Sequence, residues 1–163
     1  MLNNPVNIRA ALPKDIPELL RHMRSLAEFE RYINEFAVDE ESLLSRAFGK
    51  HPECSIFVSE SRDGIIGYAV IIAIPFTYDL KTTMIIKEFF VVTEHRGGGV
   101  GSNLFRHIAA WALAKGAGRL KWDVMAGNIN AEKFYQKHGA GPDNKWIPYV
   151  INEDALKSLL RQS

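Results

Sequence analysis

A glycine-rich turn directly follows an apolar, strand-like run and leads into a helical pattern. Phe89, Phe90 and Val91 belong to the run, and Arg96 precedes the turn. Glycines turn tightly and leave backbone N–H groups uncovered, and the following helix would add its N-terminal N–H groups and the positive end of its dipole. These features predict a backbone cradle for a phosphate or pyrophosphate. The residues of the cradle are Gly97, Gly98, Gly99, Val100, Gly101 and Ser102.

The spacing excludes two common nucleotide-binding loops. A Walker loop requires a lysine after its last glycine, and here Ser102 follows Gly101. A dinucleotide fingerprint requires a third glycine, at a position that Ser102 or Leu104 occupies here. A merely flexible strand-to-helix connection is the remaining alternative. It would not need four glycines within five positions.

The pattern of apolar residues predicts the elements that position this turn. Pro13 suits the first turn of a helix, and Asp63–Gly64 is typical of a hairpin turn. The order of elements predicts a mixed α/β fold with an antiparallel first half and a βαβ second half. The expected strands are 6–10, 54–61, 65–75, 82–92, 120–125 and 146–151, and the expected helices are 13–27, 40–48, 101–115, 130–138 and 154–160.

Composition and charge narrow the class of protein. The 163 residues are 47% hydrophobic and 24% charged, which is typical of one globular domain, expected here over residues 1–163. A net charge of +1 gives no electrostatic reason to expect a nucleic-acid or membrane partner. Cys54, the only cysteine, cannot form an internal disulfide. With no signal peptide or membrane-spanning run visible, we expect a cytoplasmic protein.

Two motifs together resemble those of a known family. Arg96-x-x-Gly99-x-Gly101, between a strand and a helix, resembles the pyrophosphate motif of the GCN5-related N-acetyltransferases. Asn128, followed by a short helical pattern that contains Tyr135 and ends at Gly139, is similar to the second signature of that family. The resemblance implies an α/β fold of the GNAT type. This fold has a mixed, mostly antiparallel sheet and a central βαβ unit that binds acetyl-CoA, flanked by helices.

Segments outside these motifs resemble one branch of the family, the diamine (spermidine/spermine) acetyltransferases. They are residues 26–30, 48–52 and 76–79, together with Trp146. The likeness implies direct transfer of acetyl from acetyl-CoA to a primary amine of a small molecule, of the diamine, polyamine or lysine-analogue type. It also implies a homodimer. Two alternatives are an acetyltransferase of a peptide or protein amine and a CoA-binding module without turnover.

The resemblance assigns donor-side roles residue by residue. The backbone of Phe89, Phe90 and Val91 would pair with the pantetheine arm of acetyl-CoA. Arg96 would either add charge at the pyrophosphate or brace the turn. Tyr135 matches the tyrosine near the sulfur and would protonate the leaving thiolate, the alternative being a core tyrosine. On the far side, the residues expected to hold the arm are Asn128, Asn130 and Ala131.

At the position expected for the general base, this chain differs from the diamine acetyltransferases. Where the diamine enzymes have two adjacent acids, this chain has Lys87-Glu88, so the position of the family's presumed base is a lysine. Neighbouring strand residues face opposite ways, so Glu88 would not simply replace the missing acid. Glu88 would bind the substrate ammonium, with water or another group taking the proton. An exposed strand residue paired with Lys87 is the alternative.

Other substrate contacts follow from the branch. Phe29 and Glu30 match a substrate-contact segment, Asn144 stands where the branch has a loop acid, and Trp146 would border the cleft. Fewer acids and the added Lys87 favour a shorter amine or a lysine analogue that carries its own carboxylate. The histidines are scattered without paired ligand spacing, so no metal is expected. A further substrate-lining segment contains Lys121 and Asp123.

Overall fold

The computed structural model describes residues 6–161; residues 1–5, to which the expectation about a signal peptide applies, and residues 162–163 lie outside it. The described residues divide into two compact units, 6–123 and 124–161. No helix in the described part of the chain is long and apolar enough to cross a membrane.

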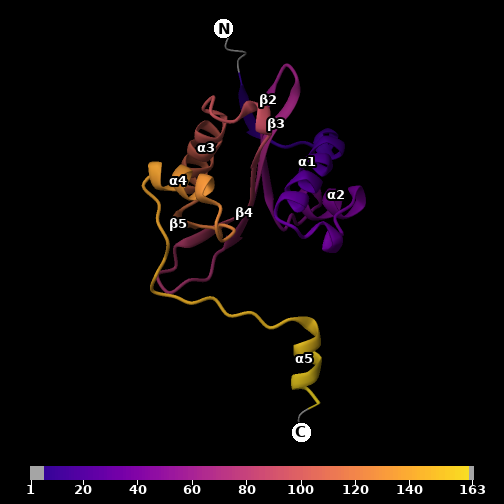
Figure 1. The fold of residues 1–163 in the computed structure, drawn as a ribbon, viewed down its shortest axis with the longest axis vertical. Helices are drawn as coiled ribbons and strands as arrows, with labels where there is room; N and C mark the ends of the chain where they lie inside the picture. The colour runs from indigo at the N-terminus through magenta and orange to yellow at the C-terminus, as the bar shows by residue number, and fades with distance from the viewer. Residues whose placement is uncertain (1–5, 162–163) are drawn as a thin grey trace. The chain divides into compact units, whose positions relative to one another are not determined.

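The first unit is built on a five-stranded sheet whose strands follow each other in chain order (Figure 1). Each pair of neighbours is antiparallel except the last, β4 with β5, which is parallel. Gly64, with φ of +98°, forms the predicted hairpin turn between β2 and β3. The strands are β1 (Asn7–Ala10), β2 (Ser55–Ser61), β3 (Gly64–Ile74), β4 (Thr82–Val91) and β5 (Ala117–Lys121).

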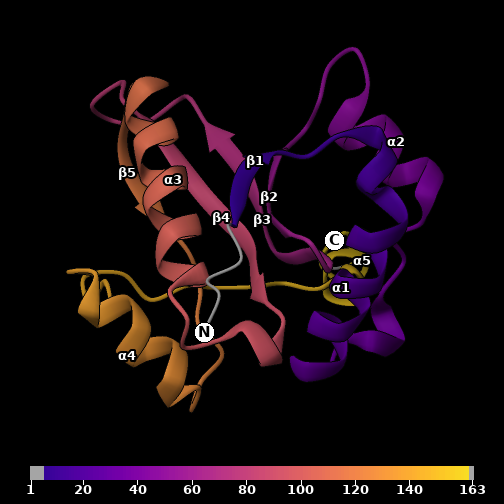
Figure 2. The ribbon, with the colours of Figure 1, turned by 90° about the horizontal axis from the view of Figure 1, so that it is seen from above.

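Helices cover both faces of this sheet. Figure 2 shows α1 (Ile16–Phe29) and α2 (Glu40–Phe48) on one face and α3 (Val100–Ala114) on the other. Three short 3₁₀ turns, Pro13–Asp15, Ile33–Glu35 and Thr93–His95, lie between these elements. The predicted mixed, mostly antiparallel α/β sheet with a central βαβ unit, here β4, α3 and β5, is confirmed.

Each face of the sheet packs against its own set of apolar side chains. On the α1/α2 face, Leu19 of α1 and Val58 and Tyr68 of the sheet have no exposed surface. On the α3 face, Phe57 contacts Trp111 at 5.0 Å between ring centroids, and Phe89 contacts Phe105 at 6.2 Å. Packing on both faces thus fixes the directions of these side chains.

A partly buried ion-pair network attaches the start of α1 to the edge of the sheet. Arg9 of β1 donates to the Asp15 carboxylate at 2.6 and 3.0 Å and to Glu60 of β2 at 2.9 and 3.0 Å. Asp15 is 6% exposed and also accepts the Leu12 N–H at 2.8 Å. Its pKa is held below the ordinary value, chiefly by the hydrogen bond from Arg9.

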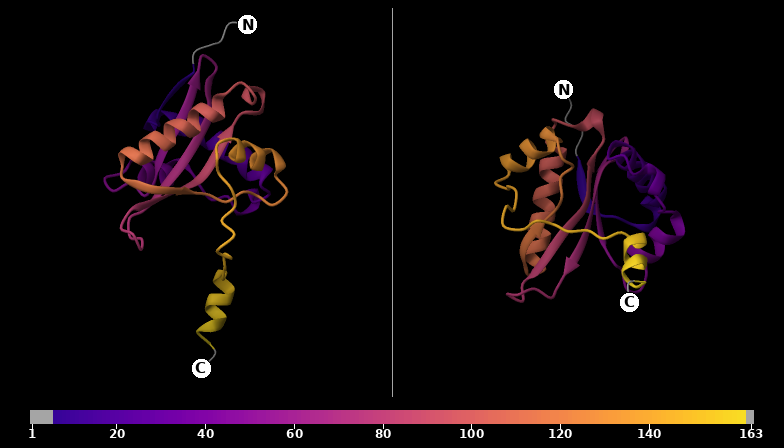
Figure 3. Two further views of the ribbon diagram at one scale, coloured as in Figure 1. Left: turned by 90° about the vertical axis from the view of Figure 1, so that its left-hand side faces the viewer. Right: turned by 60° about the horizontal axis from the view of Figure 1, so that its bottom comes forward.

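Two predicted strands need correction. The strand expected at 120–125 is β5, over Ala117–Lys121. Gly116, with φ of +78°, ends the helical run at once, and the strand begins directly after it. The strand expected at 146–151 does not form, and Figure 3 shows an extended segment between α4 and α5. The apolar residues of this segment led to the prediction of a strand, but Tyr149 and Val150 are over 90% exposed. Pro148 also has no N–H to donate to a strand ladder.

The second unit contains two short helices, α4 (Ile129–Lys137) and α5 (Glu153–Leu159). Each begins with an asparagine whose side chain accepts a hydrogen bond from the third helical N–H. Asn128 accepts from Ala131 at 3.2 Å, and Asn152 accepts from Ala155 at 2.9 Å. Gly139, with φ of +80°, follows α4 as a C-terminal stop.

Candidate active site

The glycine turn has the geometry of a backbone cradle. Gly97 and Gly99 adopt the left-handed conformation, with φ of +79° and +87°, which favours glycine. A Cβ at either position would meet no atom within 4 Å, so the space above the turn is open and suits a bound pyrophosphate. Val100 begins α3 and is buried against Ile66 and Val91, which anchors the turn to the sheet.

Arg96 braces this turn. Its Nε donates to the Val91 carbonyl at 2.7 Å, and its guanidinium lies 5.8 Å from the centre of the Phe90 ring. Of the two roles expected from the sequence, the bracing role has direct geometric support. The contact ties the entrance of the turn to the end of β4.

The end of β4 presents backbone groups at its outer edge. The parallel ladder with β5 ends at the pair Ile85 and Lys121. Val92 N–H donates to the Ile66 carbonyl, so Gly67 and Val91 form a non-hydrogen-bonded pair in the β3–β4 ladder. In such a pair the N–H and C=O groups point away from the partner strand. The backbone N–H of Val91, and by alternation the backbone groups of Phe89, therefore point to this outer edge, where the Val91 carbonyl accepts the hydrogen bond from Arg96.

A β-bulge turns Lys87 and Glu88 toward the same face of the sheet. Val70 pairs with Glu88 and Ile71 pairs with Ile86, so Lys87 is the extra residue in β4. Both side chains line one hollow on the α1/α2 face. The expectation that these neighbours face opposite ways is wrong, because the bulge interrupts the alternation of the strand.

The hollow beside Lys87 and Glu88 has a volume of about 450 Å³. Its floor is apolar, and Arg46 and Glu53 add a second pair of opposite charges, joined by a 2.8 Å ion pair. An apolar floor with a few charged groups is typical of a small-molecule site. The apolar lining comes mainly from Met23, Val38, Leu43, Cys54, Ile56, Val70 and Ile72.

Glu88 lies in an acidic and aromatic cluster. The Tyr68 hydroxyl donates to Glu88 Oε2 at 2.7 Å. Burial raises the pKa of Glu88, with a further contribution from Glu30, and the Tyr68 hydrogen bond opposes the rise. Burial, together with Glu88 and Glu30, raises the pKa of Tyr32 to about 12. Two carboxylates near each other form a favourable place for an ammonium group.

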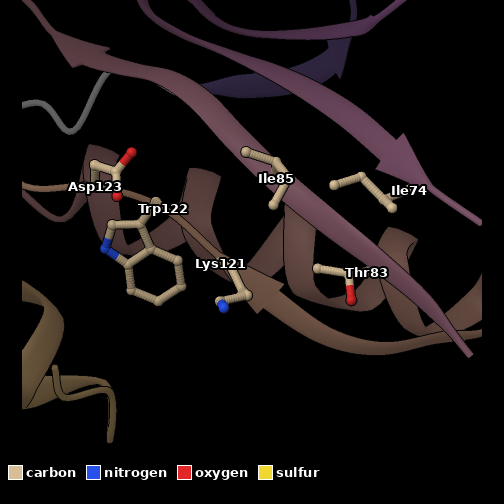
Figure 4. Close-up of a pocket in the computed structure, with 6 residues that line it drawn as sticks. All are labelled: Ile74, Thr83, Ile85, Lys121, Trp122 and Asp123. Atoms are coloured by element: carbon tan, nitrogen blue, oxygen red, sulfur yellow. The ribbon is translucent and has the colours of Figure 1, made fainter. Parts of the chain in front are cut away.

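A second hollow of about 400 Å³ lies on the same face, farther along β4 (Figure 4). Ile85 lines this second hollow, and its pairing partner in β3, Ile72, lines the first. On its other side Ile85 pairs with Lys121 of β5. Asp123, predicted as a substrate contact, also lines this second hollow. The face of the sheet from Glu88 to Asp123 thus carries charged groups of both signs.

The remaining predicted residues are placed as follows. Phe29 is the last residue of α1 and is half exposed. Glu30 follows it, and partial burial of its carboxyl raises its pKa. In the second unit, Tyr135 lies on α4 with its ring 5.1 Å from that of Phe134. Asn130 and Ala131 lie in the first turn of α4, and Asn144 and Trp146 lie in the exposed segment after it.

Sequence reasoning missed Tyr68 and Tyr32. Tyr68 is the one hydroxyl-bearing side chain in the apolar run of β3, which is a signal, but its partner depends on the register of β3 against β4. Tyr32 lies in the connection after α1, where the sequence shows no periodicity. The β-bulge cannot be predicted from the residue types of β4 alone.

A glycine turn at a helix start, a strand edge beside it and a neighbouring hollow are features that an acyl-group transferase can use. A family model described as the acetyltransferase (GNAT) family matches residues 18–140, so the chain belongs to this family of N-acetyltransferases.

Two curated relatives are similar to this chain over most of its length, and a solved structure is similar to it in fold. The thialysine N-epsilon-acetyltransferase of Bos taurus is 31% identical over 94% of this chain and 96% of its own length. The L-ornithine N5-acetyltransferase of Arabidopsis thaliana is 22% identical over 93% of this chain and 86% of its own. An integron cassette protein from V. cholerae shares the fold, with a TM-score of 0.78 and 24% identity over 96% of this chain and 98% of that chain.

Proposed function

We propose that the protein transfers acetyl from acetyl-CoA directly to the side-chain amine of a small, basic amino acid. The observation that carries this proposal is the bulge in β4. It places the Lys87 ammonium and the Glu88 carboxylate on one hollow. A basic amino acid carries complementary charges, a distal ammonium and a carboxylate, whereas a diamine carries ammonium groups alone.

The donor side uses backbone groups. The cradle from Gly97 to Ser102 holds the pyrophosphate with its N–H groups, and Arg96 keeps the turn in place. The pantetheine arm lies along the outer edge of Phe89 to Val91, with Phe90 between them, and an N–H there polarises the thioester carbonyl. The far side of the arm is bound by Asn128, Asn130 and Ala131.

The acceptor side uses opposite charges. Glu88 and Glu30 hold the reacting ammonium, and Lys87 binds the carboxylate of the acceptor. The apolar floor of the hollow receives the methylene chain between them. Phe29, Asp123, Asn144 and Trp146 are proposed as further contacts of the acceptor.

Two proton transfers complete the reaction. Glu88 accepts a proton from the ammonium, and burial suits it to this role because it raises the pKa of the carboxyl above its ordinary value. The neutral amine then attacks the thioester carbon, forming the C–N bond as the C–S bond breaks. Tyr135 donates its proton to the leaving thiolate, and the second proton that the acetylated nitrogen must lose restores Tyr135 through solvent. No covalent intermediate on the protein is required.

The names of the relatives support an amino-acid acceptor, since thialysine and ornithine both carry a carboxylate besides the amine. The diamine-branch resemblance supports a homodimer as the assembly. A cytoplasmic location is proposed because the chain has a single cysteine and no structural disulfide to maintain.

The test is release of free thiol from acetyl-CoA with four classes of acceptor: lysine and ornithine, diamines and polyamines, lysine-containing peptides, and aminoglycosides. We expect the basic amino acids to give the highest kcat/KM. A preference for peptides would support the protein-amine alternative instead. Binding of CoA without thiol release from any acceptor would leave only a non-catalytic module.

A further inference from the structure

Tyr68 is a buried tyrosine with one defined polar contact. It has no exposed surface, and its ring lies among the apolar side chains of the α1/α2 face, 5.8 Å from the Phe90 ring. Its hydroxyl donates to Glu88 Oε2 at 2.7 Å. A hydroxyl buried in an apolar core is costly unless it is hydrogen-bonded, so this contact fixes where the hydroxyl lies.

The register of the sheet determines this contact. Tyr68 pairs with Phe90 and Val70 pairs with Glu88, so Tyr68 and Glu88 are diagonal neighbours across β3 and β4. An aromatic residue and a long side chain can reach each other across such a diagonal. The pairing from Phe90 to Glu88 is regular, so Glu88 emerges on the same face as Phe90, and the bulge at the adjacent Lys87 brings that side chain to the same hollow.

We propose that Tyr68 is a positioning residue for the reaction, because it holds Oε2 of Glu88 and leaves Oε1 as the oxygen that meets the acceptor amine. This inference rests on the proposed function of Glu88. A carboxylate held through one oxygen presents the other in a single orientation, which favours proton transfer along a fixed line. The same hydrogen bond favours the ionised form of the carboxylate, which is the form that can take a proton.

Other titratable groups also face Glu88, and they bear on how its ionisation responds to pH. Glu30, after α1, opposes the ionisation of Glu88, and Lys87 favours it. The charge of Glu88 contributes to raising the pKa of the Tyr32 hydroxyl and of the Cys54 thiol. The Arg46–Glu53 pair lines the same hollow from α2 and the loop after it. Replacing the Tyr68 hydroxyl removes one favourable contact and leaves all of these groups in place.

The experiment compares the wild type, Tyr68→Phe, Glu88→Gln and the double variant, with kcat/KM for the acceptor measured across pH. Tyr68→Phe keeps the ring and removes only the hydroxyl. We expect kcat/KM to fall about ten- to a hundredfold and the acidic limb of the profile to move to higher pH. The KM for acetyl-CoA should stay unchanged. Tyr149→Phe, at a 94% exposed tyrosine, is the matched control and should behave as the wild type.

The double variant decides between positioning and a general structural role. If Tyr68 acts through Glu88, Tyr68→Phe has no further effect in the Glu88→Gln background. A full additional loss there, or an acidic limb that does not move in Tyr68→Phe, would overturn the proposal. Wild-type kcat/KM in Glu88→Gln would instead refute the proposed role of Glu88, and with it the positioning role of Tyr68.

Discussion

At the scale of single residues, the proposed acceptor site depends on two neighbours of opposite charge. Lys87 is exposed and Glu88 is partly buried, yet the bulge brings both to the same hollow. Their burial differs, so their roles differ. An exposed ammonium is suited to recognise a solvated carboxylate, while a carboxyl shielded from water has the raised pKa that a base requires.

Lys87→Gln should change acceptor preference without harming the fold. We expect the KM for lysine to rise about five- to tenfold, because the acceptor carboxylate loses its charged partner. The KM for cadaverine, which is lysine without the carboxylate, should not rise. Steady-state kinetics with both acceptors measures the difference, and Lys115→Gln at the end of α3 is the charge-matched control. Equal rises for both acceptors would contradict carboxylate binding by Lys87.

Glu88→Gln should lower activity and raise stability. The pKa of Glu88 is raised in the fold, so its contribution to stability is present below the ordinary value of 4.5 and is lost as pH rises through the raised pKa. Removing the charge should therefore add about 1 kcal/mol, or roughly 2–4 °C in Tm, near pH 8. The gain should vanish near pH 4. Thermal unfolding at the two pH values measures it, and a gain that does not depend on pH would contradict burial of the ionised carboxyl.

At the scale of elements, a short turn and one helix start hold the site in place. The glycine turn runs from the braced end of β4 into α3, and its conformation requires glycine at positions 97 and 99. On the opposite face, the Arg9 network fixes where α1 begins, and α1 ends beside the predicted acceptor residue Glu30.

Gly98→Ala tests the cradle without straining it. Gly98 is not among the glycines with positive φ, and a Cβ there would meet only the His95 carbonyl oxygen, at 3.9 Å. The fold should tolerate the change, while the added methyl crowds a pyrophosphate resting on the turn. We expect the KM for acetyl-CoA to rise about tenfold or more with Tm nearly unchanged. An unchanged KM would place the pyrophosphate elsewhere.

Arg9→Met should destabilise the fold in a pH-dependent way. Arg9 lowers the pKa of the buried Asp15, so this stability is present above the ordinary value of 3.8 and is lost as pH falls through the lowered value. At pH 7 the loss should be about 2–4 kcal/mol, because an acidic side chain stays buried without its partner. It should shrink toward pH 3. Urea unfolding measures both, with the exposed Arg62→Met as control; an equal loss at the two pH values would contradict the ion-pair account.

At the scale of the whole molecule, the sequence predicts the order of the elements through α4 and the position of the glycine turn before α3. The glycines at 97 and 99 and the capping Asn128 act locally, so the local structure can be predicted from these residue types. The acceptor side depends on pairing between distant strands. Neither the bulge at Lys87 nor the bond from Tyr68 to Glu88 follows from the periodicity of one strand. The strand expected at 146–151 fails for a related reason, because apolar letters do not supply a ladder partner.

The most direct test of the account is a competition in one vessel. Equimolar lysine and cadaverine compete for limiting acetyl-CoA, and the ratio of the two acetylated products, read by mass spectrometry, equals the ratio of their kcat/KM values. The account predicts an excess of acetyl-lysine of about fivefold or more, because only lysine offers charges complementary to both Lys87 and Glu88. An equal yield, or an excess of acetyl-cadaverine, would contradict it.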